Sequence, residues 1–318
     1  MNSLSLVLSM LCPSALPQEP RDAGPVEIQQ VRRAVERGLP FIEKKGVDWI
    51  RDRKCSSCHH ATFLIWSHRE ALDRGFAVDP KKLKEWTAWA VDFSLKEKNA
   101  EGRRNGGGLD TLGQLILARR SYRDDPSAEA PNREISELIL GMQKPEGFWE
   151  AGGQLPSQRR PKAETDEAST RWVLHSLQSL GPEDEARKAG REKAMKWLEG
   201  RKPGKSNESL ALALVTTPSE PLLKELLARQ NEDGGWSWLN GEASDALATG
   251  QTLYALSLVG PKADAGPVRR AWTFLARTQG EDGSWPVPST KAKPKDASIS
   301  TYWGTAWAAI GLLRTLPE

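Results

Sequence analysis

The segment that decides the fold is KELLARQNEDGGWSWLNG, Lys224–Gly241, because its pattern occurs twice more in the chain. The related segments are SELILGMQKPEGFWEAGG, Ser136–Gly153, and TFLARTQGEDGSWPVPS, Thr273–Ser289. In each segment an amphipathic helical pattern ends at a Gln, and an acidic residue, a Gly, any residue and a Trp follow. Such self-similarity along a chain indicates stacked helical units and not a single mixed fold.

A second, more apolar helix is expected after each of these tryptophans. The segments TDEASTRWVLHSLQSL (165–180), SDALATGQTLYALSL (244–258) and DASISTYWGTAWAAIGLL (296–313) begin with Asp, Ser or Thr. These side chains can accept hydrogen bonds from the free amides of a first helical turn. Small residues then lie along one face, which lets neighbouring helices approach closely. Each unit is therefore an outer charged helix followed by an inner apolar helix.

Three further pairs complete the chain and give six helical hairpins. Their outer helices lie in 31–46, 83–95 and 192–200, and their inner helices in 59–75, 106–122 and 206–215. The inner helices are short, and no polar capping repeat appears at either end. We therefore predict an all-α fold in which six hairpins close into an α/α toroid, an α6/α6 barrel spanning 26–318, in preference to an open superhelix.

Composition limits the classes of function. The 318 residues are 38% hydrophobic and 27% charged, and 45 basic against 42 acidic residues give a net charge of +3. The basic residues are scattered, which argues against nucleic-acid binding. No segment after the N-terminus approaches the run of about 20 apolar residues that a membrane-spanning helix needs. The N-terminal residues 1–18, with the apolar run LSLVLSMLC, resemble a signal peptide, so we expect an exported, periplasmic protein, although no Lys or Arg precedes Arg21.

The Q-x-x-[DE]-G-x-W pattern and the small-residue helix after it resemble the QW repeat of the squalene-hopene cyclase and protein prenyltransferase superfamily. The resemblance covers about residues 26–318 and is strongest in the last two repeats. It implies an α6/α6 barrel in which Gln230, Trp236, Gln279 and Trp285 have structural roles. The same roles follow from the residues, because a Trp at a helix corner buries a large face while its indole N–H finds one partner.

Cyclase chemistry is not expected. A class II cyclase of this superfamily protonates an alkene with the middle Asp of a D-x-D-D-T motif. Here the corresponding residues are Asp245-Ala-Leu-Ala-Thr249, and Asp166-Glu-Ala-Ser-Thr170 fails in the same two places. The D-D-x-x-D motif that holds magnesium and diphosphate is also missing from the sequence. We therefore predict the fold without this activity.

The stretch RKCSSCHHAT, Arg53–Thr62, is the other distinctive feature. Gly46–Trp49 aligns with the Trp corners of the later repeats, so Cys58 aligns with Asp245 at the start of an inner helix. In the cyclases this end of the barrel opens to the substrate cavity. We therefore expect the cysteines and histidines of this stretch to lie at the functional rim.

Three interpretations of the rim cluster remain open. C-x-x-C-H is the signature of c-type haem, with thioether bonds to Cys55 and Cys58 and iron bound by His59. The sixth iron ligand is then sought among His60, His68, His175 and Met142. The second interpretation is a zinc site formed by the cysteines, a histidine and a carboxylate such as Asp110 or Asp166. The resemblance to protein prenyltransferases supports it, because those enzymes hold zinc at a barrel rim. A Cys55–Cys58 disulfide is the third.

These features lead to one functional prediction with two alternatives. We expect a toroid that carries haem c, or a metal held among His59, His60, His68 and His175, at its rim. Such a protein would serve electron transfer or redox sensing with a redox partner protein, or bind an apolar small molecule in the barrel cavity. The alternatives are a non-catalytic binding scaffold and a zinc-dependent, prenyltransferase-like enzyme.

Overall fold

The computed structural model describes residues 26–56, 59–95, 108–119, 126–152, 158–260, 265–293 and 297–317. These residues form twelve helices and no strand. The six outer helices are α1 (Ile28–Arg53), α3 (Pro80–Leu95), α5 (Pro126–Gly141), α7 (Glu185–Leu198), α9 (Glu220–Ala228) and α11 (Gly266–Thr278). The six inner helices are α2 (Ala61–Asp73), α4 (Leu109–Ala118), α6 (Lys162–Gln178), α8 (Asn207–Thr216), α10 (Ala246–Val259) and α12 (Ser298–Thr315).

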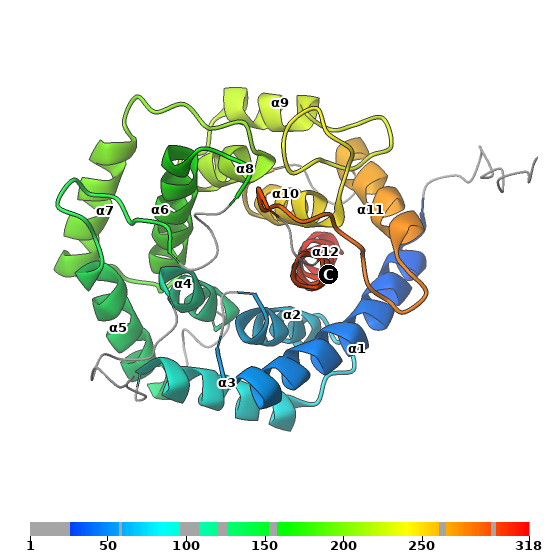
Figure 1. Cartoon of the computed structure of the whole chain (residues 1–318), viewed down its shortest axis with the longest axis horizontal. Helices are drawn as coiled ribbons and strands as arrows, with labels where there is room; N and C mark the ends of the chain where they lie inside the picture. The colour runs from blue at the N-terminus through cyan, green and yellow to red at the C-terminus, as the bar shows by residue number, and fades with distance from the viewer. Residues whose placement is uncertain are drawn as a thin grey trace, which may run out of the picture.

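The hairpins close into a ring. Each inner helix packs against the next one, and α12 packs against both α10 and α2, so that the inner layer has no open end. Figure 1 shows the outer helices as a second ring around it, with α11 beside α1. The predicted α/α toroid of six outer and inner pairs is therefore confirmed. None of the described helices is long and apolar enough to cross a bilayer.

Each Trp corner joins three helices, as the one between α9 and α10 shows. The indole Nε1 of Trp236 donates to the carbonyl of Leu226 in α9 at 2.8 Å, and its backbone N–H donates to Thr249 Oγ1 in α10 at 2.9 Å. Gln230 Nε2 donates to the carbonyls of Gly234 and of Pro267 in α11, at 2.7 and 2.8 Å. One corner therefore holds its own hairpin and the next outer helix together.

The same contacts recur at Trp149 and Trp285, which confirms the structural role predicted for the motif. At the last corner Gln279 Nε2 donates to the carbonyl of Ala34 at 2.8 Å, so this corner binds the first helix and closes the ring. Gly283 has a positive φ of 83°, and a Cβ there would lie 2.1 Å from the carbonyl oxygen of Arg37. Glycine is required at this point both by conformation and by space.

The first hairpin departs from this plan, and our expectation of a corner at Gly46–Trp49 is wrong. Helix α1 continues through these residues to Arg53. In the three corners the residue two before the Trp is a glycine with a positive φ, whereas Val47 occupies that position here. A β-branched residue strongly resists the left-handed conformation, so the helix does not turn.

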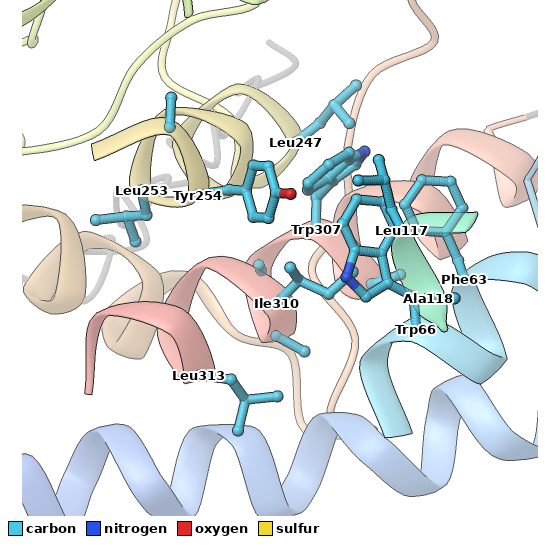
Figure 2. Packing of buried hydrophobic residues seen from close by; sticks show 14 of the residues in the cluster. Phe63, Trp66, Leu117, Ala118, Leu247, Leu253, Tyr254, Trp307, Ile310 and Leu313 are labelled. Carbon is cyan, nitrogen blue, oxygen red and sulfur yellow. The ribbon is translucent and has the colours of Figure 1, made fainter. Parts of the chain in front are cut away.

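The core lies between and within the two rings. Figure 2 shows Phe63 and Trp66 of α2 beside Trp307 of α12, with Tyr254 of α10 on its other side. The ring centroids of Trp66 and Trp307 are 5.2 Å apart. A Cβ on Gly250 of α10 would lie 2.3 Å from the carbonyl oxygen of Trp307, so small residues permit the close approach that the sequence predicts.

Candidate functional site

The candidate site is a cavity of about 620 Å³ inside the inner ring. Residues at the starts of three inner helices line it, among them Asp110 of α4, Glu208 of α8 and Ile299 of α12. The described side chains that form the apolar wall are Phe63, Trp66, Leu109, Leu117, Trp172, Val173, Ile299, Trp303 and Trp307. Most polar lining residues precede or begin these helices. The cavity therefore combines an aromatic floor with a polar mouth.

A charged pair is built into the mouth between the α5–α6 loop and α8. Arg160 Nη1 lies 2.7 Å from the Glu208 carboxylate, and both side chains are almost completely buried. Trp172 Nε1 and Gln251 Nε2 also donate to Glu208 Oε1, at 3.1 and 3.0 Å. Arg160 donates in addition to Ser206 Oγ at 3.1 Å. A buried ion pair with this many hydrogen bonds is rigid and fixes the Glu208 carboxylate in place.

Asp110, in the first turn of α4, differs from Glu208. It lines the same cavity, but its carboxyl makes no hydrogen bond within the described part of the chain. Burial, reinforced by the negative charge of Glu208 and partly offset by Arg160, raises the pKa of Asp110 from 3.8 to about 7. Asp110 therefore exchanges its proton near neutral pH, and such a shifted carboxyl in a cavity is typical of functional sites.

A strap crosses the mouth of the cavity. The backbone N–H of Arg159 donates to the carbonyl of Thr290 at 2.9 Å, and Gln158 forms a β-bridge with Lys291. Gln158 precedes α6 and Lys291 precedes α12, two inner helices with α8 and α10 between them on one side of the ring. The segment that begins at Gln158 is thus part of the site, because Gln158 and Arg160 are buried and line the cavity.

His59 and His60 lie together at the rim, as the sequence predicts. The imidazole of His60 stacks between Trp49 and Tyr302, with ring centroids 4.3 and 4.1 Å away, and His59 Nδ1 lies 2.5 Å from His60 Nδ1. Burial lowers the pKa of His59 to about 4 and that of His60 to about 3, with smaller contributions from nearby positive charge. Both rings are therefore neutral at pH 7, and His59 reaches the cavity wall.

The other predicted ligands do not join them. His68 is buried on the outer side of α2, where Nδ1 lies 2.9 Å from the carbonyl oxygen of Leu64 and the ring meets Trp86 of α3. His175 Nε2 lies 2.7 Å from Tyr254 Oη, and neither histidine lines the cavity. Cys55 is partly exposed and lies two residues after the end of α1, and Cys58 lies outside the described residues.

No group of three or more His, Cys, Asp or Glu side chains in the described segments is arranged to hold a metal. Met142 is exposed at the end of α5. Asp166, considered as a zinc ligand, instead accepts from the backbone N–H of Ala151 at 2.9 Å and pairs with Lys162. Among the described residues of this stretch, His59 and His60 lie in contact, and the haem and zinc interpretations stay predictions.

Asp245 and Asp166, the aspartates that align with the first Asp of the cyclase motif, have structural roles. Asp245 caps α10 by accepting from the N–H of Ala248 at 2.8 Å, and it accepts from the N–H of Trp238 at 2.8 Å. Asp166 binds the equivalent loop amide two residues after its corner Trp. These carboxyls therefore shape the rim loops.

Sequence reasoning missed the polar mouth of the cavity. Asp110 was considered only as a zinc ligand, and Arg160 and Glu208 were not considered at all. A signal was available in Glu208, since an acidic residue in SNESLALALV, an otherwise apolar inner helix, needs a buried partner. That partner comes from a loop about 50 residues earlier, which no local pattern indicates.

The comparisons with known proteins place the fold among terpene cyclases and sugar hydrolases. No family model matches the chain. A curated relative, drimenyl diphosphate synthase from Streptomyces showdoensis, is 37% identical over 78 residues, which are 24% of this chain and 14% of that protein. The chain thus matches about a seventh of that relative.

Solved structures match nearly the whole chain. A type II terpene cyclase from Scytonema, solved with geranylgeranyl dihydroxybenzoate, has a TM-score of 0.54 at 13% identity and covers 91% of this chain and 98% of that one. An unsaturated glucuronyl hydrolase from Streptococcus agalactiae has a TM-score of 0.53 at 11% identity, with 93% of both chains covered. A protein from Actinoplanes has a TM-score of 0.54 at 18% identity and covers 90% of this chain and 99% of that one. The toroid fold is shared, and identities this low show the fold alone.

Proposed function

We propose that the protein binds a small, largely apolar molecule inside the toroid, with its apolar part on the aromatic floor and its polar end at the mouth. The observation that carries this proposal is the cavity itself. It has a volume of about 620 Å³ and is lined by the aromatic side chains of Phe63, Trp66, Trp172, Trp303 and Trp307. Cavities of this size with an apolar wall and a few placed polar groups are typical of small-molecule sites.

The energetics favour an elongated ligand. Each buried methylene contributes about 0.8 kcal/mol, so a chain of about ten carbons gains enough to offset the loss of its freedom on binding. The terpene cyclase from Scytonema, which shares the fold, was solved with geranylgeranyl dihydroxybenzoate. That ligand also joins a long apolar chain to a polar ring, which supports a related division of the cavity in this chain.

A fluorescence titration tests the proposal. Because Trp303 and Trp307 line the cavity, saturable binding of 1-decanol should change the intrinsic tryptophan emission of the full chain. Ala168 also lines the cavity, so Ala168→Phe should fill it and weaken binding about 10-fold or more. The matched control is Ala88→Phe on the exposed face of α3, which should bind as the wild type does. Absence of saturation in the wild type, or equal binding by both variants, overturns the proposal.

A second candidate is a haem or metal centre at the rim, supported by His59. This residue lines the cavity and engages His60 through Nδ1, so its Nε2 is the nitrogen that could bind iron or zinc. Haem would supply one-electron chemistry and zinc a Lewis acid. Either group would lie beside the apolar ligand, and a redox partner protein would then approach this rim.

Spectroscopy and metal analysis test the second candidate. The full chain, including residues 1–18, would be expressed in a host that attaches haem outside the cytoplasm. A reduced absorption band that stays with the polypeptide after denaturation supports haem, and one equivalent of zinc in a colourless sample supports zinc. A colourless, metal-free protein whose Cys55→Ser, Cys58→Ser variant still binds 1-decanol leaves a binding scaffold. The mass of the mature N-terminus tests export in the same sample.

A further inference from the structure

The unpaired Asp110 is the feature of the cavity that neither the fold nor an apolar ligand explains. Its neighbour Glu208 has Arg160, Trp172 and Gln251 as partners, whereas no described group donates to Asp110. Further polar atoms of wall residues have no hydrogen-bond partner in the described structure, among them Ser169 Oγ, which can accept, and the Nε1 donors of Trp303 and Trp307. Buried polar atoms without partners are costly and commonly mark a place where another molecule binds.

The charges around Asp110 define what is missing. Arg160 is committed to Glu208 at 2.7 Å, so this pair is neutral as a unit. The charges that act on Asp110 are Glu208 and Arg160, whereas Lys291 acts on His59. If Asp110 ionises, this side of the mouth therefore has two carboxylates and one cation. It lacks one positive charge.

We propose that the ligand of the cavity is a protonated amine with an apolar body, whose ammonium group binds Asp110 and Ser169 while its hydrocarbon chain lies on the aromatic floor. An ammonium group has three N–H donors and no acceptor, which suits a carboxylate and a hydroxyl oxygen. The indole of Trp172, beside Glu208, offers an aromatic ring close to the same position. This inference deepens the proposed function and rests on it.

The proposal predicts that a proton is released when the amine binds. An alkylamine has a pKa near that of lysine, about 10.4, and reaches the cavity already charged. Asp110, neutral in the free protein at slightly acid pH, gives its proton to solvent when the ammonium arrives. The other titratable groups at the cavity are Glu208, Arg160, His59, Lys291 and Lys293. The helices packed against α4 add no titratable side chain to the described cavity wall. Helices α2 and α6 contribute apolar and aromatic side chains and Ser169, and α3 and α5 contribute no lining residue.

The test compares three probes of equal length, decylamine, 1-decanol and decanoate, by calorimetry on the full chain. Decylamine should bind the wild type about 10- to 100-fold more tightly than 1-decanol at pH 7.5, the range of a charge-assisted pair. Near pH 6 its binding should release close to one proton, measured as a heat that depends on the ionisation enthalpy of the buffer. Asp110→Asn should lose most of the preference for decylamine over 1-decanol, both measured in that variant, and should release no proton. Lys291→Met should keep that preference.

Every outcome separates the inference from the proposed function. Decylamine and 1-decanol binding equally overturns the inference while the apolar cavity stands. Decanoate binding most tightly, with loss in Lys291→Met, moves charge recognition to the opposite side of the mouth and also overturns it. If no probe binds, the proposed function fails as well. Should Asp110→Asn unfold, the proton release of the wild type still decides, because an amine that binds elsewhere leaves the proton of Asp110 in place.

Discussion

The last corner of the toroid and the matching stretch of its first hairpin show how one repeat can be kept for structure and another changed. At Gln279–Trp285 the chain turns, and the corner binds α11, α12 and α1. At Gly46–Trp49 the chain remains helical, and Trp49 stacks on His60. The difference depends on whether a glycine stands two residues before the Trp, as Gly283 does and Val47 does not. Without that turn, the rim of the first hairpin can carry His59 to the cavity.

The largest expected difference between the two regions is in their tryptophans. Trp285 is 1% exposed and bonded at both its indole and its backbone nitrogen, so Trp285→Ala should lower the free energy of unfolding by about 3–5 kcal/mol. Trp49→Ala, in the half-buried stretch, should cost less than half of that. Chemical denaturation of both variants measures this, and equal losses would break the comparison.

The glycine of the last corner gives the next effect. Gly283→Ala should cost about 3 kcal/mol, because it adds a clash with the Arg37 carbonyl to the strain of a positive φ. Gly241, with a φ of 88° and open space around its Cβ position, is the matched control, and Gly241→Ala should cost about 1 kcal/mol. The difference between their denaturation midpoints isolates the contact between the last repeat and the first.

Acid should affect the first hairpin more than the corners, because His59, His60 and His68 lie there. Burial lowers the pKa of His68 to about 4 in the folded protein. In the unfolded chain the imidazole binds a proton below about pH 6.5, whereas the folded imidazole stays neutral until about pH 4. Its neutral form therefore stabilises the fold fully above that pH and progressively less toward pH 4. In His68→Gln the unfolding free energy should fall less steeply between pH 6 and 4.5, by up to about 1.4 kcal/mol per pH unit. An unchanged slope would contradict the burial of this ring.

The smallest effect should come from the stack at the rim. Tyr302 Oη donates to the carbonyl of His60 at 3.0 Å, and its ring packs on the His60 imidazole. Tyr302→Phe keeps the stack and should cost only about 1 kcal/mol. Hydrogen exchange at the amides that follow His60 should increase in this variant and not at the Trp236 corner. A loss as large as that of Trp285→Ala would mean that the rim stack is also a main support of the ring.

The repeats made most of the fold predictable from sequence. The Gln, Gly and Trp of each corner follow one another within seven residues, and their partners are backbone groups that any sequence provides. The same reasoning failed at Val47, where one missing glycine cancels the turn although the Trp is present. The site was harder to predict, because Asp110, Arg160 and Glu208 come from three consecutive hairpins and meet only when these hairpins stack. Glu208 and Arg160 act on the pKa of Asp110 only because the fold brings the three side chains together.

The most direct test of the account is a crystal structure of the full chain grown with a saturating concentration of decylamine. The account predicts continuous density for the hydrocarbon chain inside the inner ring, in contact with Phe63, Trp303 and Trp307, with the nitrogen beside Asp110. Density for the probe outside the toroid, with none inside the ring, would contradict the claim that this cavity is the binding site.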